Sequence, residues 1–515
     1  MTVTKRSHFS PLATVPLLIS LAGASVPAAA ADKALLDILL GNGVITQEQY
    51  DGLMQKQSLT SEDILGGGAA TPAPEPAAKS ATLAEQPVSP QVARQIDVAV
   101  AQAVDKRMTD DSDSGFIESL GNQVALNLPV NADYTDKGFR LESKDGRYQT
   151  NLQWRAQMRY SDPYRSDPRQ VSDFGGDGTR DFDTRRLRMK IGGHGYQPWL
   201  KYYFEVDLQP TRDVDDDTFS SSARLITWRA DIAKWDWASL RLGQWKVDLN
   251  QERVDSSGRQ QFVERSIVNR VFTVDRQMGV QLYGHLFQET PADMRYYVGA
   301  FTGEGRGTSN DDDNLMYMGR LQWNFLGRDM PWRMTDVEYT EQPTGALAFA
   351  GFTNEGVCTR WSSSGCGHLD GYEPALLAQP GQYEIDQWVQ EFSFKWRGFS
   401  ALQEYHNKTI RDSVNNTEDE MTGGFAQAGY FFHHLFPVVP APLEVAFRYA
   451  YVDEPNAVDR TLENERQEYT VGLNWFFSGH NNKLTLDYSH LTLDDEFLSE
   501  DVSDNRIRLQ WDVSF

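Results

Sequence analysis

Residues 148–160, YQTNLQWRAQMRY, alternate between apolar and polar side chains without a break. Successive side chains of a β-strand point to opposite faces, so this strand has one apolar face and one face of amide and guanidinium groups. Segments with the same period of two recur at regular intervals from residue 147 to residue 515, and sixteen can be counted. The chain is therefore predicted to be all-β, and its fold depends on which face of the strands meets water.

The connections between the sixteen segments alternate in length. Those after odd-numbered segments are mostly long, as in residues 161–180, 249–275 and 354–383, and those after even-numbered segments are mostly short. The long connection 327–343 is the clearest exception. Long loops at one end, tight turns at the other and an even number of strands are typical of an outer-membrane barrel. We predict a 16-stranded antiparallel transmembrane β-barrel over residues 138–515.

The apolar residues indicate the same fold. No run of 18 or more apolar residues follows the N-terminal segment, so no transmembrane helix is predicted there. The last predicted strand, RIRLQWDVSF, has Ile507, Leu509, Trp511, Val513 and Phe515 on one face. This face would favour aggregation on the edge of a soluble sheet, whereas a barrel turns it toward lipid. A terminal aromatic strand also resembles the signal by which barrel proteins are recognised for membrane insertion.

In such a barrel the polar faces line the lumen, and they carry more basic than acidic residues. The predicted inward basic residues are Arg155, Arg159, Arg186, Arg188, Lys190, Lys201, Arg229, Arg241, Arg295, Arg320, Lys395, Arg397, Arg448, Arg506 and Arg508. The inward acids in the same register are Glu205, Asp207, Asp231, Glu391, Glu444, Asp487 and Asp512.

The whole chain has a formal charge of -24, so its acidic excess is expected mainly in the loops. A low-dielectric wall concentrates the field of the basic groups, and rings of arginine or lysine favour anions. The guanidinium fork matches phosphate and carboxylate oxygens. The alternative is that each arginine only pairs with an opposing acid and stabilises the wall.

The third long connection, residues 249–275, carries four more candidate anion-binding residues: Arg253, Arg259, Arg265 and Arg270. Acidic residues are interleaved with them. A connection of this length is usually functional. We expect it to fold into the lumen and narrow the pore; the alternative is an exposed flap.

The region before the barrel is predicted to have four parts. Residues 1–30 combine an early basic pair, an apolar run and a small-residue cleavage site, as in a secretory signal peptide. Residues 31–57 are predicted to form a short helical module, and residues 58–90 are an Ala/Pro-rich linker that cannot support a core. Residues 91–110 are predicted to be a helix, with a short coiled coil between subunits as an alternative.

Two cysteines, Cys358 and Cys366, lie eight residues apart in the stretch CTRWSSSGC. In an exported protein this spacing favours a disulfide within a loop. A zinc site would need two more ligands, and only His368 is near in sequence. We predict a disulfide and no metal site.

Several stretches resemble the phosphate-selective porin O and P family. They are the runs RLGQWKVDLNQERVDSSGRQQFVERS and VDRQMGVQLYG, with DFDTRRLRMKIGGHGYQPWLKYYFEVDL before them and LMYMGRLQWNFLG, YTVGLNWFF and RLQWDVSF after. The opening ALLDILLGNGVITQEQYDGLM is similar to the short module that precedes the barrel in that family. The resemblance covers nearly the whole chain after the signal segment.

This resemblance implies a trimeric sixteen-stranded barrel whose third loop forms a constriction and whose basic ladder conducts phosphate-like anions. The matching motifs carry these roles to Arg186, Arg188, Lys201, Arg241 and Lys246, and to Arg253, Arg265 and Arg276 in and after the loop. Strong phosphate preference in the family depends on lysines at the narrow point, whereas residues 249–275 contain no lysine. Phosphate, polyphosphate and other small anions therefore all stay open as solutes.

Other functional classes are less consistent with the sequence. A lipid-hydrolysing barrel would need a serine and a histidine on one face, but Ser489 and His490 are adjacent in a predicted strand and so point to opposite faces. We predict no enzyme activity, no catalytic residues, no cofactor and no nucleic-acid partner. The expected location is the outer membrane of a Gram-negative bacterium, in contact with lipid and lipopolysaccharide. The alternatives are a less selective porin for organic anions or other small solutes, and a surface adhesin on a barrel scaffold.

Overall fold

The computed structural model describes residues 130–163, 180–209, 223–308, 310 and 313–515. The predicted signal peptide, helical module, linker and helix of residues 1–110 lie outside the described residues. No helix among the described residues is long and apolar enough to cross a membrane.

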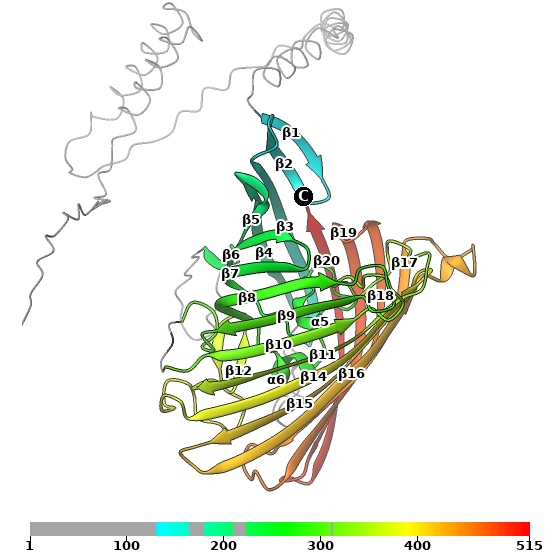
Figure 1. Ribbon diagram of the computed structural model, residues 1–515. Coiled ribbons are helices and arrows are strands. Elements are labelled where there is room, and N and C mark those ends of the chain that lie inside the picture. Colours follow the sequence, from blue (N-terminus) through cyan, green and yellow to red (C-terminus); the bar gives the residue numbers. More distant parts are fainter. Residues whose placement is uncertain (1–129, 164–179, 210–222, 309, 311–312) are drawn as a thin grey trace, which may run out of the picture. The chain divides into compact units, whose positions relative to one another are not determined.

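The predicted barrel is confirmed. One antiparallel sheet contains eighteen strands, of which sixteen form a closed barrel and two, β1 and β2, form an added hairpin. The barrel strands are β3 (Gln149–Asp162), β4 (Asp181–Gly195), β5 (Gln197–Asp207), β6 (Arg224–Trp235), β7 (Ala238–Lys246), β8 (Arg276–Leu286), β9 (Met294–Phe301), β10 (Met316–Trp323), β11 (Thr344–Gly356), β14 (Tyr383–Trp396), β15 (Phe399–Asp412), β16 (Thr417–Tyr430), β17 (Leu443–Pro455), β18 (Glu463–Ser478), β19 (Asn482–Asp495) and β20 (Glu500–Ser514). Each barrel strand pairs with its neighbours along the chain, and β20 pairs with β3 to close the ring (Figure 1).

Along the barrel strands, outward positions are apolar, whereas inward positions are mostly polar, with buried apolar residues such as Val389, Leu402 and Phe425 where the third loop packs. In β18, for example, Glu468 and Thr470 are fully buried, whereas Tyr469 and Val471, which alternate with them, are 40% and 46% exposed. A soluble protein buries its apolar face, so this inverted pattern is the one expected when lipid covers the outside. The predicted orientation of the strands therefore agrees with the structure, with one correction. Arg397, predicted inward, is exposed in the turn after β14, because the strand ends at Trp396.

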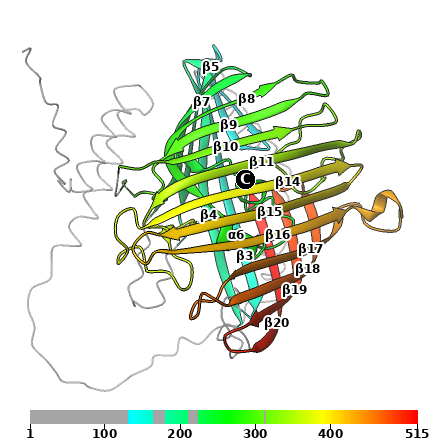
Figure 2. The same ribbon diagram turned by 60° about the horizontal axis from the view of Figure 1, so that its bottom comes forward.

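The connection between β7 and β8, residues 247–275, is called the third loop below. It contains two short helices, α5 (Gln251–Val254) and α6 (Val268–Phe272), which lie among the barrel strands in Figure 1, and Figure 2 shows the same for α6. Its backbone amides donate hydrogen bonds to carboxylates on the inner faces of several strands. The amides of Gln251, Glu252, Val263 and Ile267 donate to Glu391, Glu404, Asp487 and Glu468, respectively, over 2.7–3.0 Å.

Apolar contacts fix the third loop on one wall of the barrel. Phe272 of α6 belongs to a buried apolar cluster that includes Val389 of β14, Leu402 of β15 and Phe425 of β16. Gly423 of β16 leaves room for it, since a Cβ atom there would lie 2.5 Å from the Phe272 ring. Gly472 of β18 similarly leaves room for the ring of Phe262, because a Cβ atom at Gly472 would lie 3.0 Å from that ring. The inner surface at these positions is therefore shaped to receive the loop.

Three small elements are additional to the predicted strands. β1 (Val130–Thr135) and β2 (Gly138–Ser143) form a hairpin, and β2 pairs with the first half of β3. β12 (Arg360–Ser362) and β13 (Gly365–Gly367) form a second, shorter hairpin after β11. A 3-10 turn, η2 (Phe432–His434), follows β16. Only the second of these hairpins contributes to the site described next.

Candidate functional site

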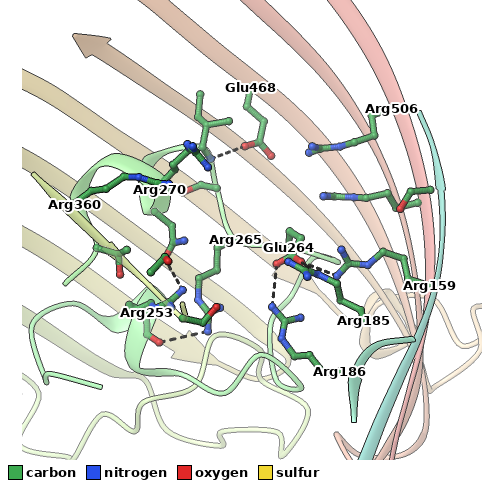
Figure 3. A pocket seen from close by; sticks show the side chains of 18 of the residues that line it. Arg159, Arg185, Arg186, Arg253, Glu264, Arg265, Arg270, Arg360, Glu468 and Arg506 are labelled. Carbon is green, nitrogen blue, oxygen red and sulfur yellow. Dashed lines mark hydrogen bonds and ion pairs between the residues drawn. The ribbon is translucent and has the colours of Figure 1, made fainter. Parts of the chain in front are cut away.

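A cavity of about 610 Å³ lies between the third loop, the β12 hairpin and the inner faces of β3, β4, β18 and β20 (Figure 3). Its lining includes nine arginines and three acids. The arginines are Arg159, Arg185, Arg186, Arg253, Arg265, Arg270, Arg360, Arg506 and Arg508, and the acids are Asp183, Glu264 and Glu468. All basic side chains among these lining residues are arginines, and we call this space the arginine cavity.

A β-bulge in β4 brings two consecutive arginines into the cavity. Gln157 of β3 pairs with Arg186, but the next residue, Met158, pairs with Thr184, so Arg185 is an extra residue on the β4 side. A bulge interrupts the alternation of faces and redirects side chains locally. As a result Arg185 and Arg186 both line the cavity, where a regular strand would have turned one of them toward lipid.

Glu264 of the third loop is the focus of the ion pairs in the cavity. Its Oε1 atom lies 2.8 Å from a terminal nitrogen of Arg159 and 3.0 Å from Nε of Arg185, and its Oε2 atom lies 3.6 Å from a terminal nitrogen of Arg186. Burial acts to raise the pKa of Glu264, but the guanidinium groups of Arg159, Arg186 and Arg185 act more strongly and hold it well below its ordinary value. The carboxylate is therefore charged at neutral pH.

Other basic side chains hold the third loop in shape. Arg265 donates to the carbonyl oxygens of Glu252 and Asp255 over 2.8 and 2.7 Å. Lys246 donates to the carbonyl oxygens of Arg253 and Asp255 over 2.9 and 3.1 Å. Burial lowers the pKa of Arg265 to about 10, so it stays charged at neutral pH. Arg253 forms an ion pair with Asp275 at the end of the loop.

Five of the fourteen predicted pore residues line the arginine cavity: Arg159, Arg186, Arg253, Arg265 and Arg270. Arg506 and Arg508, which alternation predicts to point inward, line it as well. The alternation does not predict Arg185, because of the bulge, or Arg360, which belongs to the β12 hairpin. The nearest sequence signal for Arg360 is the cysteine pair on either side of it.

Most of the other predicted pore residues form ion pairs within the barrel wall. Arg155 pairs with Asp512 at 3.1 Å, and Arg188 pairs with Glu205 at 3.0 Å. The other wall pairs are Arg188–Asp207, Arg229–Asp231, Arg241–Asp231 and Arg276–Glu205, and Arg241 and Arg276 also pair with Asp248 and Asp275 of the third loop; these six distances are 2.6–3.3 Å. These pairs match the alternative in which an arginine stabilises the wall.

Besides Lys246, which holds the third loop, three more predicted residues lie apart from these pairs. Lys190 donates to the side-chain oxygen of Gln153 over 3.4 Å, and Lys201 is exposed. Arg259 is partly buried in the third loop, where its amide donates to the carbonyl oxygen of Ser256 over 2.8 Å. An excess of positive charge is present in the arginine cavity, where nine arginines face three acids, whereas five predicted pore residues outside it are paired with acids.

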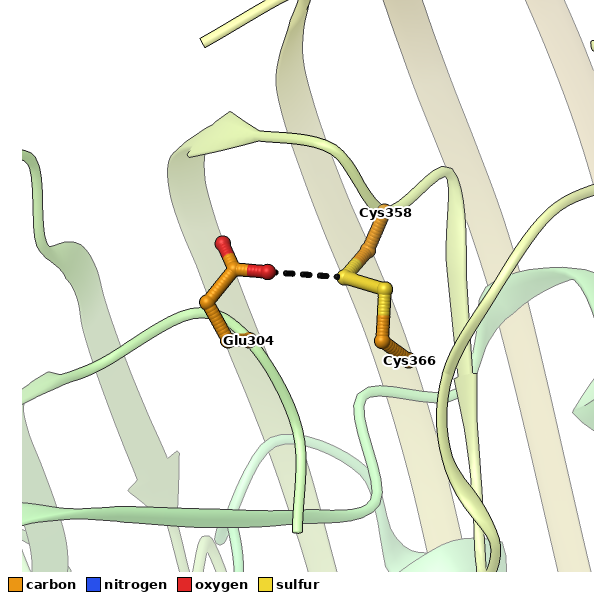
Figure 4. A group of neighbouring side chains, drawn as sticks. All are labelled: Glu304, Cys358 and Cys366. Carbon is orange, nitrogen blue, oxygen red and sulfur yellow. Dashed lines mark hydrogen bonds between the residues drawn. A yellow bond between two sulfur atoms is a disulfide. The ribbon is translucent and has the colours of Figure 1, made fainter. Parts of the chain in front are cut away.

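A disulfide joins Cys358 and Cys366, whose Cα atoms are 5.4 Å apart, and encloses the β12 hairpin that carries Arg360 (Figure 4). An Oε atom of Glu304 lies 3.3 Å from Sγ of Cys358, so three potential metal-ligating residues meet there. A metal ion binds the thiolate form of cysteine. The two sulfur atoms here are bonded to each other, so neither is a thiolate. The hairpin is also fixed by Trp361, which donates to the carbonyl oxygen of Gly303 over 2.6 Å.

The chain is similar in fold to several solved structures. A loop-deletion form of OmpT from Vibrio cholerae aligns at a TM-score of 0.47 and 9% identity over 72% of this chain and 100% of that chain. An anion-selective porin from Comamonas acidovorans gives 0.45 and 12% over 71% and 99%. The channel DcaP of Acinetobacter baumannii gives 0.44 and 11% over 73% and 99%. A search of curated proteins found no match.

The sequence comparison with protein families gives a more specific result. The profile of the phosphate-selective porin O and P family matches residues 160–515, which is more than half of the chain. The matched range begins within β3 and continues through β20, so it includes the third loop and every lining residue of the arginine cavity except Arg159. This chain therefore belongs to the phosphate-selective porin O and P family and is an outer-membrane porin.

Proposed function

We propose that the chain is a passive diffusion channel for small oxyanions, including phosphate or polyphosphate, and that the arginine cavity is the place where they are selected. The observation that carries this proposal is the lining of nine arginines and three acids around one cavity. Rings of basic groups favour anions in a pore, and the field of such groups is concentrated by low-dielectric walls.

The position of the arginines on separate elements supports passage as well as binding. Arg159, Arg186 and Arg508 project from three strands, whereas Arg265 projects from the third loop. An oxyanion would be able to exchange one guanidinium for the next along the cavity. Conduction requires such a series of weak sites, because an anion held at one strong site would not leave.

The third loop is proposed to narrow the pore on one side. Phe272 of the loop packs on β14–β16, and three of its arginines, Arg253, Arg265 and Arg270, line the arginine cavity, which is bounded on the other side by β3, β4, β18 and β20. Solutes would then pass between the loop and the arginine-bearing wall.

The other partners follow from the family and from the outer surface. We propose that the exposed apolar side chains contact lipid and lipopolysaccharide, that the chain forms a homotrimer, and that it is exported through a cleaved signal peptide.

Small organic anions are a second candidate class of solute. All basic lining residues described here are arginines, and a guanidinium pairs with a carboxylate as well as with a phosphate.

The proposal is tested with the purified protein in a planar bilayer under a gradient of potassium chloride. The reversal potential should have the sign of a chloride-selective channel, and millimolar phosphate should reduce the chloride current. A side-by-side comparison with a dicarboxylate would rank the two solute classes. Cation preference would overturn the proposal, and anion preference without block by phosphate would reject phosphate as a solute.

Anion preference should also increase as the pH falls. Glu252 of the third loop is fully buried, and burial, followed by the neighbouring Glu404 carboxylate, raises its pKa above the ordinary value. Protonation of Glu252 on going from about pH 8 to about pH 5.5 removes one negative charge from the lumen, and the anion-to-cation permeability ratio should rise roughly twofold. Because the pKa is raised in the folded protein, Glu252 favours folding at low pH and this contribution is lost as the pH increases.

The control for this pH effect is Glu252→Gln, which keeps the size of the side chain and a hydrogen-bond acceptor for Ser266. Reversal potentials of this variant should change less between the two pH values than those of the unaltered protein. An equal change in both proteins would assign the pH dependence to another group.

A further inference from the structure

Glu264 occupies the position that a bound oxyanion would be expected to take. Its two carboxylate oxygens lie 2.8–3.6 Å from the guanidinium groups of Arg159, Arg185 and Arg186, which come from β3 and from the bulge of β4. A planar oxyanion held between several guanidinium forks is the arrangement expected at an anion site. Here the anion is part of the protein.

The backbone around Glu264 is attached to the wall at three points. The amide of Val263 donates to Asp487 over 2.9 Å, and its carbonyl oxygen accepts a hydrogen bond from Arg159 over 3.3 Å. The carbonyl oxygen of Glu264 accepts a hydrogen bond from Arg448 over 3.1 Å. The carboxylate can therefore rotate about its own side-chain bonds, but it stays within reach of the same arginines.

The Glu264 side chain is also accessible from the cavity. It is 23% exposed, whereas Arg159 beside it is 7% exposed and the carboxylate of Asp512 in the adjacent wall is 2% exposed. An incoming anion would meet Glu264 and its three arginines together. Because the carboxylate is tethered, it competes at a high effective concentration with any free anion for the same donors.

We propose that Glu264 is a specificity-determining residue that acts as a built-in competing anion. It weakens the binding of free oxyanions to Arg159, Arg185 and Arg186, so that they bind briefly and then leave. This inference rests on the proposed function of the arginine cavity and assigns a role within it. The Glu264 carboxylate lowers the affinity of these arginines for a free oxyanion, and the faster release permits oxyanion flux through the pore.

The direct test is Glu264→Gln, which removes the charge and keeps the shape. The concentration of inorganic phosphate that halves the chloride current should fall about tenfold, which corresponds to about 1.4 kcal/mol. Phosphate flux at saturating concentration should decrease, since release becomes slower. Glu264→Asp keeps the charge, and its half-blocking concentration should stay within about twofold of that of the unaltered protein.

The matched control is Asp512→Asn, which removes one carboxylate charge from the lumen wall outside the arginine cavity, at the ion pair with Arg155. It should shift both phosphate block and the reversal potential in potassium chloride much less than Glu264→Gln does. Heat-modifiable migration on a gel would show that each variant forms a barrel. Where Glu264→Gln forms no barrel, the comparison of Glu264→Asp with the unaltered protein in phosphate flux provides the test, and a loss of flux in Glu264→Asp would overturn the inference.

The outcomes separate this inference from the proposed function. Equal shifts in Glu264→Gln and Asp512→Asn would mean that only total charge matters, and they would overturn the role of Glu264. A shift in Glu264→Asp as large as that in Glu264→Gln would do the same. If the unaltered protein prefers cations and ignores phosphate, the proposed function fails, and this result does not depend on any variant.

Discussion

A channel with Arg159, Arg185 and Arg186 all replaced by glutamine, in a Glu264→Gln background, should lose most of its preference for anions and its block by phosphate. The background is needed because Glu264 would otherwise stay in the cavity without these partners. A hydrogen bond to a charged group contributes about 1.5–3 kcal/mol, so the loss of even two such donors should weaken phosphate block by about a hundredfold or more. Planar-bilayer measurements of reversal potential and of current against phosphate concentration would show both effects.

A single replacement of a wall arginine away from the cavity provides the control. Arg295 pairs with Asp329 at 2.5 Å and is partly exposed, and it is not among the lining residues of the arginine cavity. Arg295→Gln should leave phosphate block nearly unchanged. A loss of block in this variant comparable with that of the multiple variant would mean that the arginine cavity is not the selective point.

The second large effect is expected where the third loop packs on β16. Gly423→Leu should displace Phe272, because even the Cβ atom would lie 2.5 Å from the Phe272 ring. Loss of the packing of a buried phenylalanine costs about 3–5 kcal/mol of stability, and a loss of this size should release the third loop from the wall. The single-channel conductance should rise severalfold and become noisier, and anion preference should fall as the loop leaves the arginine-bearing wall.

Two further variants make this prediction specific. Phe272→Ala in the Gly423→Leu background should recover part of the lost loop packing, since the leucine would then fill the space of the ring. Gly319→Leu is the matched control, because no atom lies within 4 Å of a Cβ at Gly319, which faces outward on β10. If Gly319→Leu alters conductance as strongly as Gly423→Leu, the effect belongs to the strand backbone and not to the loop.

The barrel was predictable from the sequence because one physical rule governs its whole length. Each strand has a lipid-facing and an inward-facing side, so apolar residues recur with a period of two, as in Tyr469 and Val471. The same rule correctly predicts Arg159, Arg506 and Arg508 to point inward. It fails at Arg185, because one extra residue in β4 shifts the pairing, and nothing in the sequence around DTRRLR marks where the bulge occurs.

The rest of the site depends on contacts between residues far apart in the chain. Which arginines face the cavity and which pair within the wall is decided by acids such as Glu205 and Asp512 on neighbouring strands, and strand alternation does not give their side-chain geometry. Some inward acids, such as Glu404 and Glu468, have another role, since they accept hydrogen bonds from backbone amides of the third loop. The charge of the lumen therefore could not be obtained by counting inward residues.

The pairing of β3 with β20 has a consequence for the order of assembly. Arg155 and Asp512, which meet across this seam, are 357 positions apart, and the third loop touches both sides of it through Gln157 of β3 and Asp487 of β19. Contacts between such distant residues form slowly, because a long stretch of polypeptide must first be ordered. Because the third loop contacts strands on both sides of this seam, it is expected to help bring the first and last strands together during assembly.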